Sequence, residues 1–303
     1  MIWPQNALGV KDELHCQLLL SNPSYVAQEK LDGMRAVVHI TKSGLRIFSR
    51  SAGVKDPTRP LEKTSSMLHL AKLTFPDLIG TVLDGEILIP GKDSSEIAGS
   101  VHRKNGNNGL VKLFVFDILR FCGRDLTGKT LAERLPLLLT TKLMMQGSEH
   151  IQFVSFATTL EQKEKLYQSV FNNGGEGVML KNLVGKYIEG GRPANNWFKF
   201  KKSATFDCVV MGFSKGKGKF ATRIGAVAFG QFVDGKLVEL GQASGMTDPV
   251  RNDMSDHPEK YISNVVVIKG MERLKSGAIR HPRYVGLRPD KSPKECVYYP
   301  NEQ

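Results

Sequence analysis

The sequence predicts an α+β fold, with a body of largely antiparallel sheet followed by a small β-barrel. The first observation is a series of short apolar strands separated by turn residues, such as 36–40 and 45–48 around a glycine-containing turn. The second is the small number of amphipathic helical segments, and the third is a change after about residue 202, where short strands dominate. At 303 residues with 41% hydrophobic residues, the chain is long enough for two domains.

The predicted elements follow from apolar periodicity and turn chemistry. In the body, besides the hairpin, we expect strands at 25–28, 82–89 and 113–121 and helices at 61–73, 131–145 and 160–172. In the remainder, we expect strands at 208–213, 224–232, 237–242 and 265–271. The expected domains are therefore 1–202 and 203–303, with a hinge at Lys201, Lys202 and Ser203.

The charge is strongly basic, with 42 Lys and Arg against 30 Asp and Glu. The net charge of +12 divides into +8 for residues 1–202 and +4 for the rest, so both parts could contact a polyanion. Nucleic acid or an anionic membrane surface are the usual partners, and a basic protein without such a partner is the alternative. Apolar runs fall far short of the ~20 residues of a membrane-spanning helix, and the first residues do not resemble an export signal. Four widely spaced cysteines suggest reduced thiols, so we expect an intracellular, cytoplasmic protein, for which a bacterial or viral origin would fit.

The densest motif is K-x-D-G-x-R, which runs from Lys30 to Arg35. A strand delivers Lys30 to an Asp-Gly turn, which would present its amine to a pocket as a nucleophile. Such an amine must lose its proton before it attacks, and neighbouring cations or a metal ion favour the neutral form. Taken alone, the motif is more typical of an exposed hairpin with ordinary surface charges.

The motif does not stand alone, because six more motifs follow it in order. Here the sequence resembles the nucleotidyltransferases that form a covalent lysyl-nucleotide, namely polynucleotide ligases and mRNA capping enzymes. Each motif is short, but the ordered series spans nearly the whole chain. The motifs are KLDGMR at 30–35, SRSAG at 49–53, LDGEI at 83–87, FVFDIL at 114–119, EGVMLK at 176–181, KFK at 199–201 and RPDK at 288–291.

Within this superfamily, the sequence is most similar to minimal ATP-dependent DNA ligases. The resemblance implies an ATP-grasp-like adenylyltransferase domain with antiparallel sheets and helices at 1–202, and a C-terminal OB-fold at 203–303. The RPDK motif argues against RNA ligases whose C-terminal domains lack it. Zinc-finger cysteines, a helix-hairpin-helix region, a module for nicotinamide mononucleotide and a separate N-terminal DNA-binding domain are not seen, so ATP is favoured over NAD.

The resemblance also implies the reaction and its catalytic residues. Lys30 would attack the α-phosphate of ATP and become lysyl-AMP, with pyrophosphate leaving. Lys199 and Lys201 would point at the α-phosphate, because they share one side of a strand whose other side carries Phe198 and Phe200. The alternative is an edge strand whose lysines are solvated. Arg288 and Lys291 would orient the pyrophosphate, although they could equally be a charged turn.

The remaining nucleotide contacts are assigned by the same resemblance. Phe116 would stack on adenine, unless it is a core aromatic, and arginines would contact ribose and phosphate, with Arg50 also reading the 5′-phosphate of the nick. Two carboxylates would hold Mg²⁺ or Mn²⁺, unless they are ordinary surface charges. The implied ATP-binding residues are Gln28, Glu29, Lys30, Arg35, Arg50, Phe116, Lys199 and Lys201; the metal ligands are Glu86 and Glu176; and the supporting residues are Asp32, Gly33, Asp84 and Asp290.

Two basic stretches suit sequence-independent contact with a DNA backbone. Solvated surface loops are the alternative. Together with Arg50, the expected DNA-binding residues are Arg103, Lys104, Lys215, Lys217, Lys219 and Arg223.

The predicted function is therefore sealing of nicks in duplex DNA, in replication, repair or recombination, by a monomer. A GTP-dependent capping guanylyltransferase or an RNA ligase would use the same lysine chemistry. A non-catalytic OB-fold nucleic-acid-binding protein is the alternative from a different class.

Overall fold

The computed structural model describes residues 1–52, 56–92, 94–102, 111–201, 203–271, 273–274 and 276–300. The chain divides into two compact units, unit 1 (Met1–Lys201) and unit 2 (Lys202–Gln303). The division falls one residue from the expected boundary, and Lys202 lies outside the described residues. In the described ranges, helices are too short or too polar to cross a membrane.

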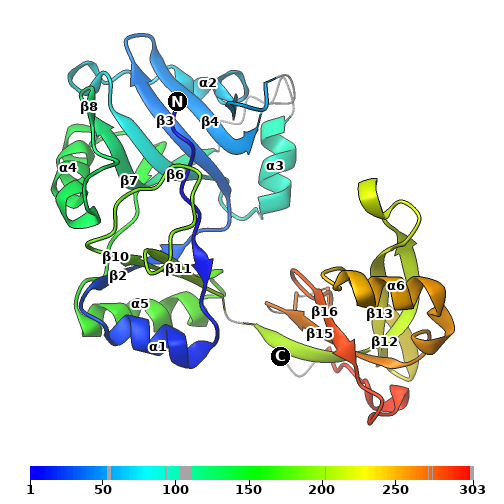
Figure 1. Ribbon diagram of the computed structural model, residues 1–303. Coiled ribbons are helices and arrows are strands. Elements are labelled where there is room, and N and C mark those ends of the chain that lie inside the picture. Colours follow the sequence, from blue (N-terminus) through cyan, green and yellow to red (C-terminus); the bar gives the residue numbers. More distant parts are fainter. Residues whose placement is uncertain are drawn as a thin grey trace. The chain divides into compact units, whose positions relative to one another are not determined.

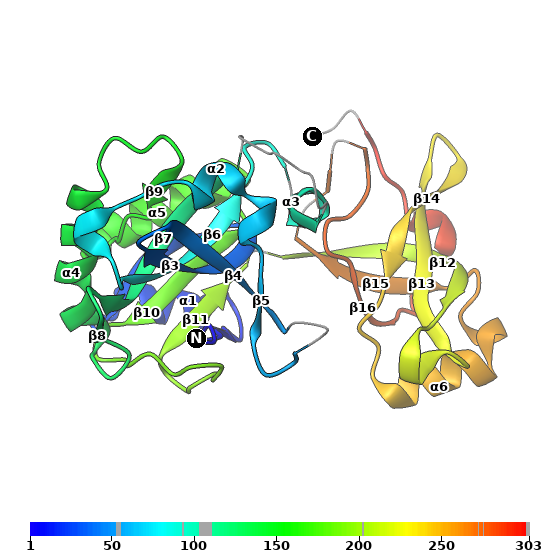
Figure 2. The same ribbon diagram turned by 90° about the horizontal axis from the view of Figure 1, so that it is seen from above.

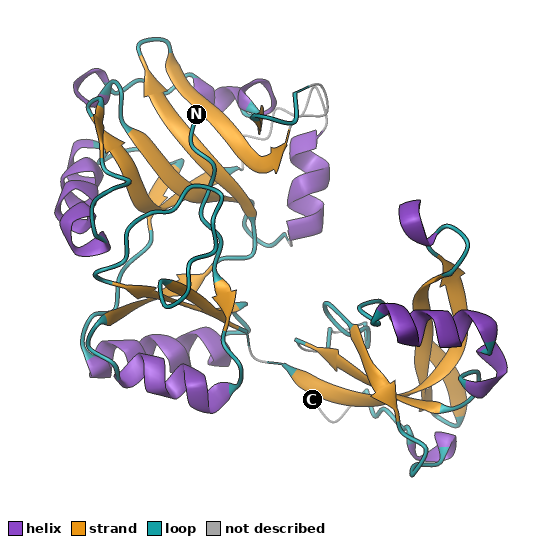
Figure 3. Ribbon diagram, in the orientation of Figure 1, coloured by secondary structure: helices purple, strands orange, loops and turns teal. Residues whose placement is uncertain are grey.

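Unit 1 contains a four-stranded sheet with helices on one face (Figures 1 and 3). Its order is β1 (Leu8–Gly9), β11 (Trp197–Phe200), β10 (Gly177–Asn182) and β2 (Tyr25–Lys30). β1 is parallel to β11, whereas β10 is antiparallel to both its neighbours. Helices α1 (Glu13–Ser21) and α5 (Leu160–Asn172) cover the face that carries Phe198 and Phe200.

The side-chain alternation of these strands leaves the opposite face for Lys30 and Lys199. Phe198 and Phe200 belong to the core under α1 and α5, while Lys199, which lies between them, points the other way. The expectation that lysines and aromatics of this strand take opposite sides is confirmed.

The second sheet of unit 1 carries the hairpin that the sequence predicts (Figure 2). It is largely antiparallel, but β9 runs parallel to β7, so both sheets are mixed rather than purely antiparallel. The strands, in spatial order, are β5 (Pro60–Glu62), β4 (Gly44–Ala52), β3 (Met34–Thr41), β6 (Val82–Leu88), β7 (Lys112–Phe121) and β8 (Arg124–Asp125), with β9 (Ile151–Phe153) beside β7.

One face of this sheet holds the main core of unit 1, which includes Val38, Leu83 and Val115. Helices α2 (Leu68–Ala71), α3 (Ser94–His102) and α4 (Leu131–Met144) contact strands of this sheet. A smaller cluster joins Val37 and Val82 of this sheet to Trp197 of the first. The two sheets of unit 1 therefore meet through a shared apolar contact.

The helices at 131–145 and 160–172 are confirmed as α4 and α5, and both begin with a capping box. In α4, the Thr130 hydroxyl accepts from the Glu133 N–H and the Glu133 carboxylate accepts from the Thr130 N–H. Helix α1 was not expected, because its apolar residues do not form one stripe: Leu14 and Leu18 are exposed.

The helix expected at 61–73 is wrong over most of its length. Residues 60–62 form β5 instead, and the helix α2 is limited to Leu68–Ala71. The Thr64 hydroxyl accepts a hydrogen bond from the Ile47 N–H at 3.0 Å, which ties this segment to strand β4. Leucine spacing alone could not reveal that tertiary contact.

Unit 2 is an antiparallel five-stranded sheet with one longer helix, α6 (Asp248–Asp256), which was not expected. The four predicted strands are confirmed as β12 to β15, and β16 is an addition. The long strand β12 pairs with both β13 and β15, and its pairing with β13 contains register shifts, one of them between Val210 and Gly212. The spatial order is β14 (Lys236–Ala243), β13 (Ile224–Val233), β12 (Ala204–Lys215), β15 (Val265–Gly270) and β16 (Arg283–Leu287).

Candidate active site

Lys30 is the last residue of β2, and it forms an ion pair with a buried glutamate. Its Nζ contacts Oε2 of Glu176, and the Nζ of Lys201 contacts the other carboxylate oxygen, Oε1. The Glu176 side chain is 3% exposed, whereas those of Lys30 and Lys201 are 19% and 35% exposed. One buried carboxylate therefore holds two amines that remain accessible to a ligand.

The ladder of the four-stranded sheet sets the spacing of these lysines. Gly177 pairs with Lys30 on β2, and its neighbour Val178 pairs with Phe200, so Gly177 lies beside the residue that follows β11, Lys201. Gly177 has φ of +152°, and a Cβ there would lie 2.0 Å from the Phe200 carbonyl oxygen. The backbone thus requires glycine, and a glycine puts no side chain between the two amines.

The turn after Lys30 packs directly on β6. A Cβ on Gly33 would lie 2.3 Å from the Ile87 carbonyl oxygen and 2.8 Å from Cγ of Glu86. Asp32, the other turn residue, is partly buried. This close approach brings the end of β2, and with it Lys30, next to the LDGEI motif.

Arg35 is held in place by Asp84 of that motif. Its Nε and Nη2 donate to the two carboxylate oxygens at 2.6 and 2.7 Å, and the Tyr187 hydroxyl donates to the same carboxylate at 2.6 Å. Burial alone would lower the pKa of Arg35, but the Asp84 carboxylate raises it above its usual value. The arginine is therefore a fixed cation, and Asp84 acts as its support.

Phe116 lies among cations and a second aromatic ring. Cζ of Arg35 is 4.6 Å from its ring centroid and Nζ of Lys181 is 4.3 Å from it, while Trp197 meets it edge-on with centroids 6.4 Å apart. Burial lowers the pKa of Lys181 to about 7. Aromatic surface next to positive charge suits a purine attached to phosphates.

Positive charges gather around Lys199. Burial lowers the pKa of Lys199, and the charges of Lys30, Lys201, Arg192 and Arg50 lower it further. Arg50 is exposed. This concentration of cations can stabilise the negative charge of a phosphoryl group.

The residues before Lys30 differ in their orientation. Gln28 is 1% exposed, shares the face of Lys30 by alternation, and donates through Nε2 to the Val154 carbonyl at 3.3 Å. Glu29 pairs with Val178, whose side chain belongs to the core under α1 and α5. Of these two expected nucleotide contacts, only Gln28 turns its side chain toward the lysines.

The two expected metal ligands, Glu86 and Glu176, are close enough for the charge of one to affect the pKa of the other. The pKa of Glu86 is raised to about 7, chiefly by burial; the charges of Asp84 and Glu176 add to this rise, and those of Arg35 and Lys30 oppose it. In the described residues, no three His, Cys, Asp or Glu side chains form a preassembled metal cage. Mg²⁺ commonly uses one or two carboxylates together with water and substrate phosphates, so a pair of carboxylates that repel each other fits this ion.

In unit 2, both cations of the RPDK motif bind the same aspartate. Nη1 of Arg288 and Nζ of Lys291 donate to Oδ2 of Asp207 at 2.6 and 2.9 Å. Arg288 also contacts Asp290 at 3.4 Å. Asp207 lies in β12, whereas the two cations follow β16.

The expected DNA contacts of unit 2 are not equivalent. Lys219 and Arg223 pair with Asp248 and Asp256, whereas in the described part of the chain no ion pair involves Lys215 or Lys217. Lys215 is the last residue of β12, and the other three lie between β12 and β13. Arg103 and Lys104 lie outside the described residues.

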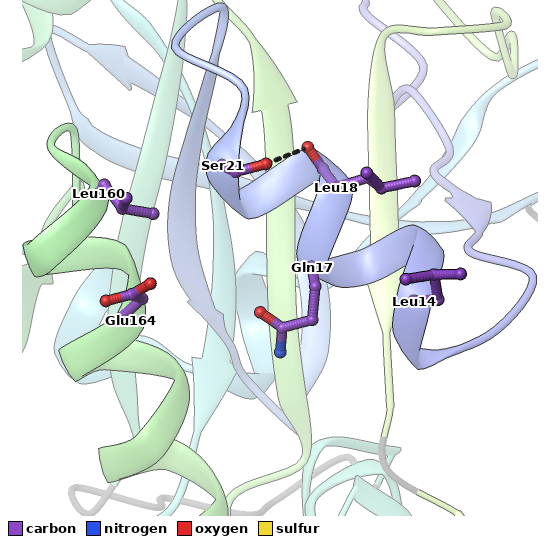
Figure 4. Close-up of a pocket in the computed structure, with 6 residues that line it drawn as sticks. All are labelled: Leu14, Gln17, Leu18, Ser21, Leu160 and Glu164. Atoms are coloured by element: carbon purple, nitrogen blue, oxygen red, sulfur yellow. Dashed lines mark hydrogen bonds between the residues drawn. The ribbon is translucent and has the colours of Figure 1, made fainter.

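A shallow groove elsewhere in unit 1 lies between α1 and α5 (Figure 4). Because both helices cover the other face of the four-stranded sheet, the groove is separated from Lys30 by the sheet. Its lining residues are Leu14, Gln17, Leu18, Ser21, Leu160 and Glu164.

Comparison with known families bears directly on the Lys30 site. The family model described as ATP dependent DNA ligase domain matches residues 12–201, which contain every site residue of unit 1 named above. This chain belongs to the ATP-dependent DNA ligase family.

Relatives of this ligase family support the assignment over most of the chain. The DNA ligase of Natronomonas pharaonis is 28% identical over 299 residues, which cover 89% of this chain and 52% of the relative. The DNA ligase of Methanothrix thermoacetophila is 30% identical over 316 residues, which cover 91% of this chain and 54% of the relative. The chain thus spans about half the length of the curated relatives it matches.

Solved structures of ligases share the fold. A structure from a study of Lig E DNA ligases has a TM-score of 0.65 at 21% identity and covers 95% of this chain and 100% of that chain. The ligase domain of LigD from M. tuberculosis has a TM-score of 0.54 at 23% identity and covers 98% of each chain. These similarities establish the fold of a ligase nucleotidyltransferase domain with mixed sheets and helices.

Sequence reasoning missed several residues that support the ligase site. Tyr187 bonds Asp84, and Arg134 forms a fully buried, two-point ion pair with Asp117, the residue after Phe116, at 2.7 and 2.8 Å. Lys181 lies within the EGVMLK motif, yet nothing in the sequence indicated its burial. The position of Arg134 among the leucines of the predicted helix at 131–145 was the one signal available in the sequence.

Proposed function

We propose that this chain is an ATP-dependent DNA ligase that seals nicks in duplex DNA through a covalent lysyl-AMP on Lys30. The observation that carries the proposal is the pair of accessible amines of Lys30 and Lys201 on the buried Glu176 carboxylate, in a chain of the ATP-dependent DNA ligase family.

In the first step, Nζ of Lys30 attacks the α-phosphorus of ATP. A nitrogen–phosphorus bond forms, the bond from that phosphorus to the bridging oxygen breaks, pyrophosphate leaves, and the amine loses a proton to solvent. Lys199 and Lys201 stabilise the charge on the phosphoryl oxygens, while Phe116 and Gln28 contact the adenine and Arg35 the ribose. Glu176 keeps the two amines in position before ATP binds.

In the second step, a 5′-phosphate oxygen at the nick attacks the phosphorus of lysyl-AMP. An oxygen–phosphorus bond forms, the nitrogen–phosphorus bond breaks, and Lys30 leaves as an amine that takes up a proton from solvent. In the third step, the adjacent 3′-hydroxyl loses its proton and its oxygen attacks the 5′-phosphate. The bond from that phosphorus to AMP breaks, AMP leaves, and a phosphodiester bond remains. Arg50, which is exposed and close to the lysine cluster, holds the 5′-phosphate.

Glu86 and Glu176 are the proposed ligands of a divalent cation, Mg²⁺ or Mn²⁺. When bound, this ion neutralises phosphate charge during the transfer. Glu86 has a raised pKa among other carboxylates, so it takes up either a proton or a cation.

Unit 2 is proposed to be an OB-fold domain that follows an adenylyltransferase domain. Its five antiparallel strands support this proposal. Arg288 and Lys291 orient the pyrophosphate during the first step, and the chain acts as a monomer. Lys215, Lys217, Lys219 and Arg223 contact the DNA backbone.

The decisive test incubates the full chain with Mg²⁺ and radiolabelled ATP, GTP or NAD, and then with singly nicked duplexes that carry DNA or RNA on each side. A covalent AMP adduct from ATP alone, followed by sealing of the DNA nick, is expected. Lys30→Ala should abolish the adduct, whereas Lys42→Ala, in the exposed turn between β3 and β4, should not change it.

The other outcomes identify the alternatives. An adduct from GTP alone would indicate capping chemistry, and preferential sealing of RNA would indicate an RNA ligase. Binding of nicked duplex without any adduct would leave a non-catalytic nucleic-acid-binding protein.

A further inference from the structure

The cations of the RPDK motif are electrically neutralised within unit 2. Arg288 and Lys291 both bind Oδ2 of Asp207, and Arg288 also contacts Asp290. Two cations and two carboxylates have no net formal charge. In this arrangement, the cluster has little attraction for a polyanion such as a triphosphate.

Asp207 is the fixed member of this cluster. Its backbone carbonyl accepts a hydrogen bond at 2.8 Å from Nε2 of Gln231, which is 5% exposed. Oε1 of Gln231 in turn accepts from Nη2 of Arg273 at 2.6 Å. Asp207 also lies inside the paired part of β12, opposite Val267.

The two cations, by contrast, lie outside the sheet. β16 ends at Leu287, so Arg288 and Lys291 follow the last paired residue. Their side chains are 41% and 26% exposed, compared with 18% for Asp207. Long, partly exposed side chains can leave a fixed carboxylate without disturbing the strand that carries it.

We propose that Asp207 is a positioning residue that occupies Arg288 and Lys291 in place of the triphosphate and releases them when ATP or pyrophosphate competes for them. This inference rests on the proposed function, because it assumes that the two cations act on the leaving pyrophosphate. The Asp207 carboxylate takes the place of phosphate oxygens, because both bind the same guanidinium and ammonium donors. Asp207 therefore weakens ATP binding in the first step and keeps the cations away from the site when no triphosphate is present.

The test compares Asp207→Asn with the unchanged chain in adduct formation with ATP. The KM for ATP should fall about three- to tenfold, the range expected for loss of one or two partly exposed ion pairs, while the maximal rate changes by less than about twofold. Asp207→Glu, which restores the carboxylate, should return KM toward the original value. Asp253→Asn is the matched control, because it removes one charge from another ion pair of unit 2, with Lys260 at 3.2 Å.

A second readout omits ATP. On a nick that is already adenylated, the unchanged chain and Asp207→Asn should seal at equal rates. Added pyrophosphate should inhibit the variant at a three- to tenfold lower concentration, which is about the factor expected for KM. In an Arg288→Ala background, Asp207→Asn should lose most of its effect on KM, since one of its partners is already missing.

The failures are distinguishable. If the unchanged chain forms no adduct, the proposed function is wrong. If it forms the adduct but a folded Asp207→Asn protein has an unchanged or higher KM, the inference about Asp207 is overturned and the proposed function stands. Thermal unfolding checks folding, and Asp207→Ser removes the same charge with a smaller side chain should the asparagine variant not fold.

Discussion

Gly177 on β10 pairs directly with Lys30 on β2. With φ of +152° and the Phe200 carbonyl oxygen 2.0 Å from the position of a Cβ, this glycine cannot take a side chain without a shift of β11. Such a shift would move Lys201, which follows β11, relative to Lys30. The sheet register and the spacing of the two amines are therefore linked.

Gly177→Ala should lower both stability and adduct formation. The backbone conformation is essentially restricted to glycine, so we expect a loss of about 1–3 kcal/mol. Thermal unfolding should show a melting temperature lower by several degrees, at about 2–4 °C for each kcal/mol in a unit of this size. Gly128→Ala is the control, because a Cβ there meets nothing within 4 Å. Equal melting temperatures for the two variants would contradict this interpretation of the backbone.

Glu86→Gln should make the protein more stable above neutral pH while reducing adduct formation. Burial raises the pKa of Glu86 to about 7 from a usual value of 4.5, so the folded state binds the proton more tightly than the unfolded state. The cost of the charged form is absent below about pH 4.5 and is complete above about pH 7. A gain of about 1 kcal/mol is expected at pH 8 and should vanish near pH 4.

Urea unfolding of Glu86→Gln at these two pH values measures the gain in stability. Adduct formation at varied Mg²⁺ concentration measures the loss of activity. A variant that is less stable at pH 8 would show that Arg35 and Lys30 outweigh burial at this carboxylate.

His39 should make unit 1 less stable as the pH falls from about 7 to about 4. Burial, together with the nearby charges of the N-terminus, Arg120 and Arg46, lowers the pKa of His39 to about 4. The unfolded state therefore binds a proton in this range that the folded state excludes, and stability falls as the pH falls. His39→Gln should remove about 2 kcal/mol of this dependence. Denaturant unfolding between pH 4 and 7 measures it, with the exposed His257→Gln as a control that should leave the slope unchanged.

Lys215 and Lys217 should contribute more to nick binding than Lys219. Lys219 contacts Asp248 at 3.8 Å, so part of its charge is balanced within unit 2. Replacing Lys215 and Lys217 by alanine should weaken binding and reduce the slope of log K against log salt by about 1 for each lysine. Lys219→Ala, the matched control, should have a smaller effect. If every variant kept the salt slope of the unchanged chain, this loop would be excluded from the DNA contact.

The sequence predicted the strands best where both faces or one face are apolar, as at 82–89 and 113–121. It failed where a tertiary contact overrides local periodicity, as at 61–73, where Thr64 is tied to strand β4. It also missed α1, because exposed leucines such as Leu14 obscure the apolar stripe that marks a surface helix.

For the site, the sequence by itself determined the residue types and their order: a lysine before an Asp-Gly turn, two lysines alternating with aromatics, and a late RPDK motif. Only the tertiary structure decided which of these side chains meet. Lys30 and Glu176 are 146 residues apart, Arg35 and Asp84 are 49 apart, and Asp207 and Arg288 are 81 apart. Local patterns record the alternation within one strand, whereas pairs between distant strands depend on register and sheet order, which arise only when the whole core packs.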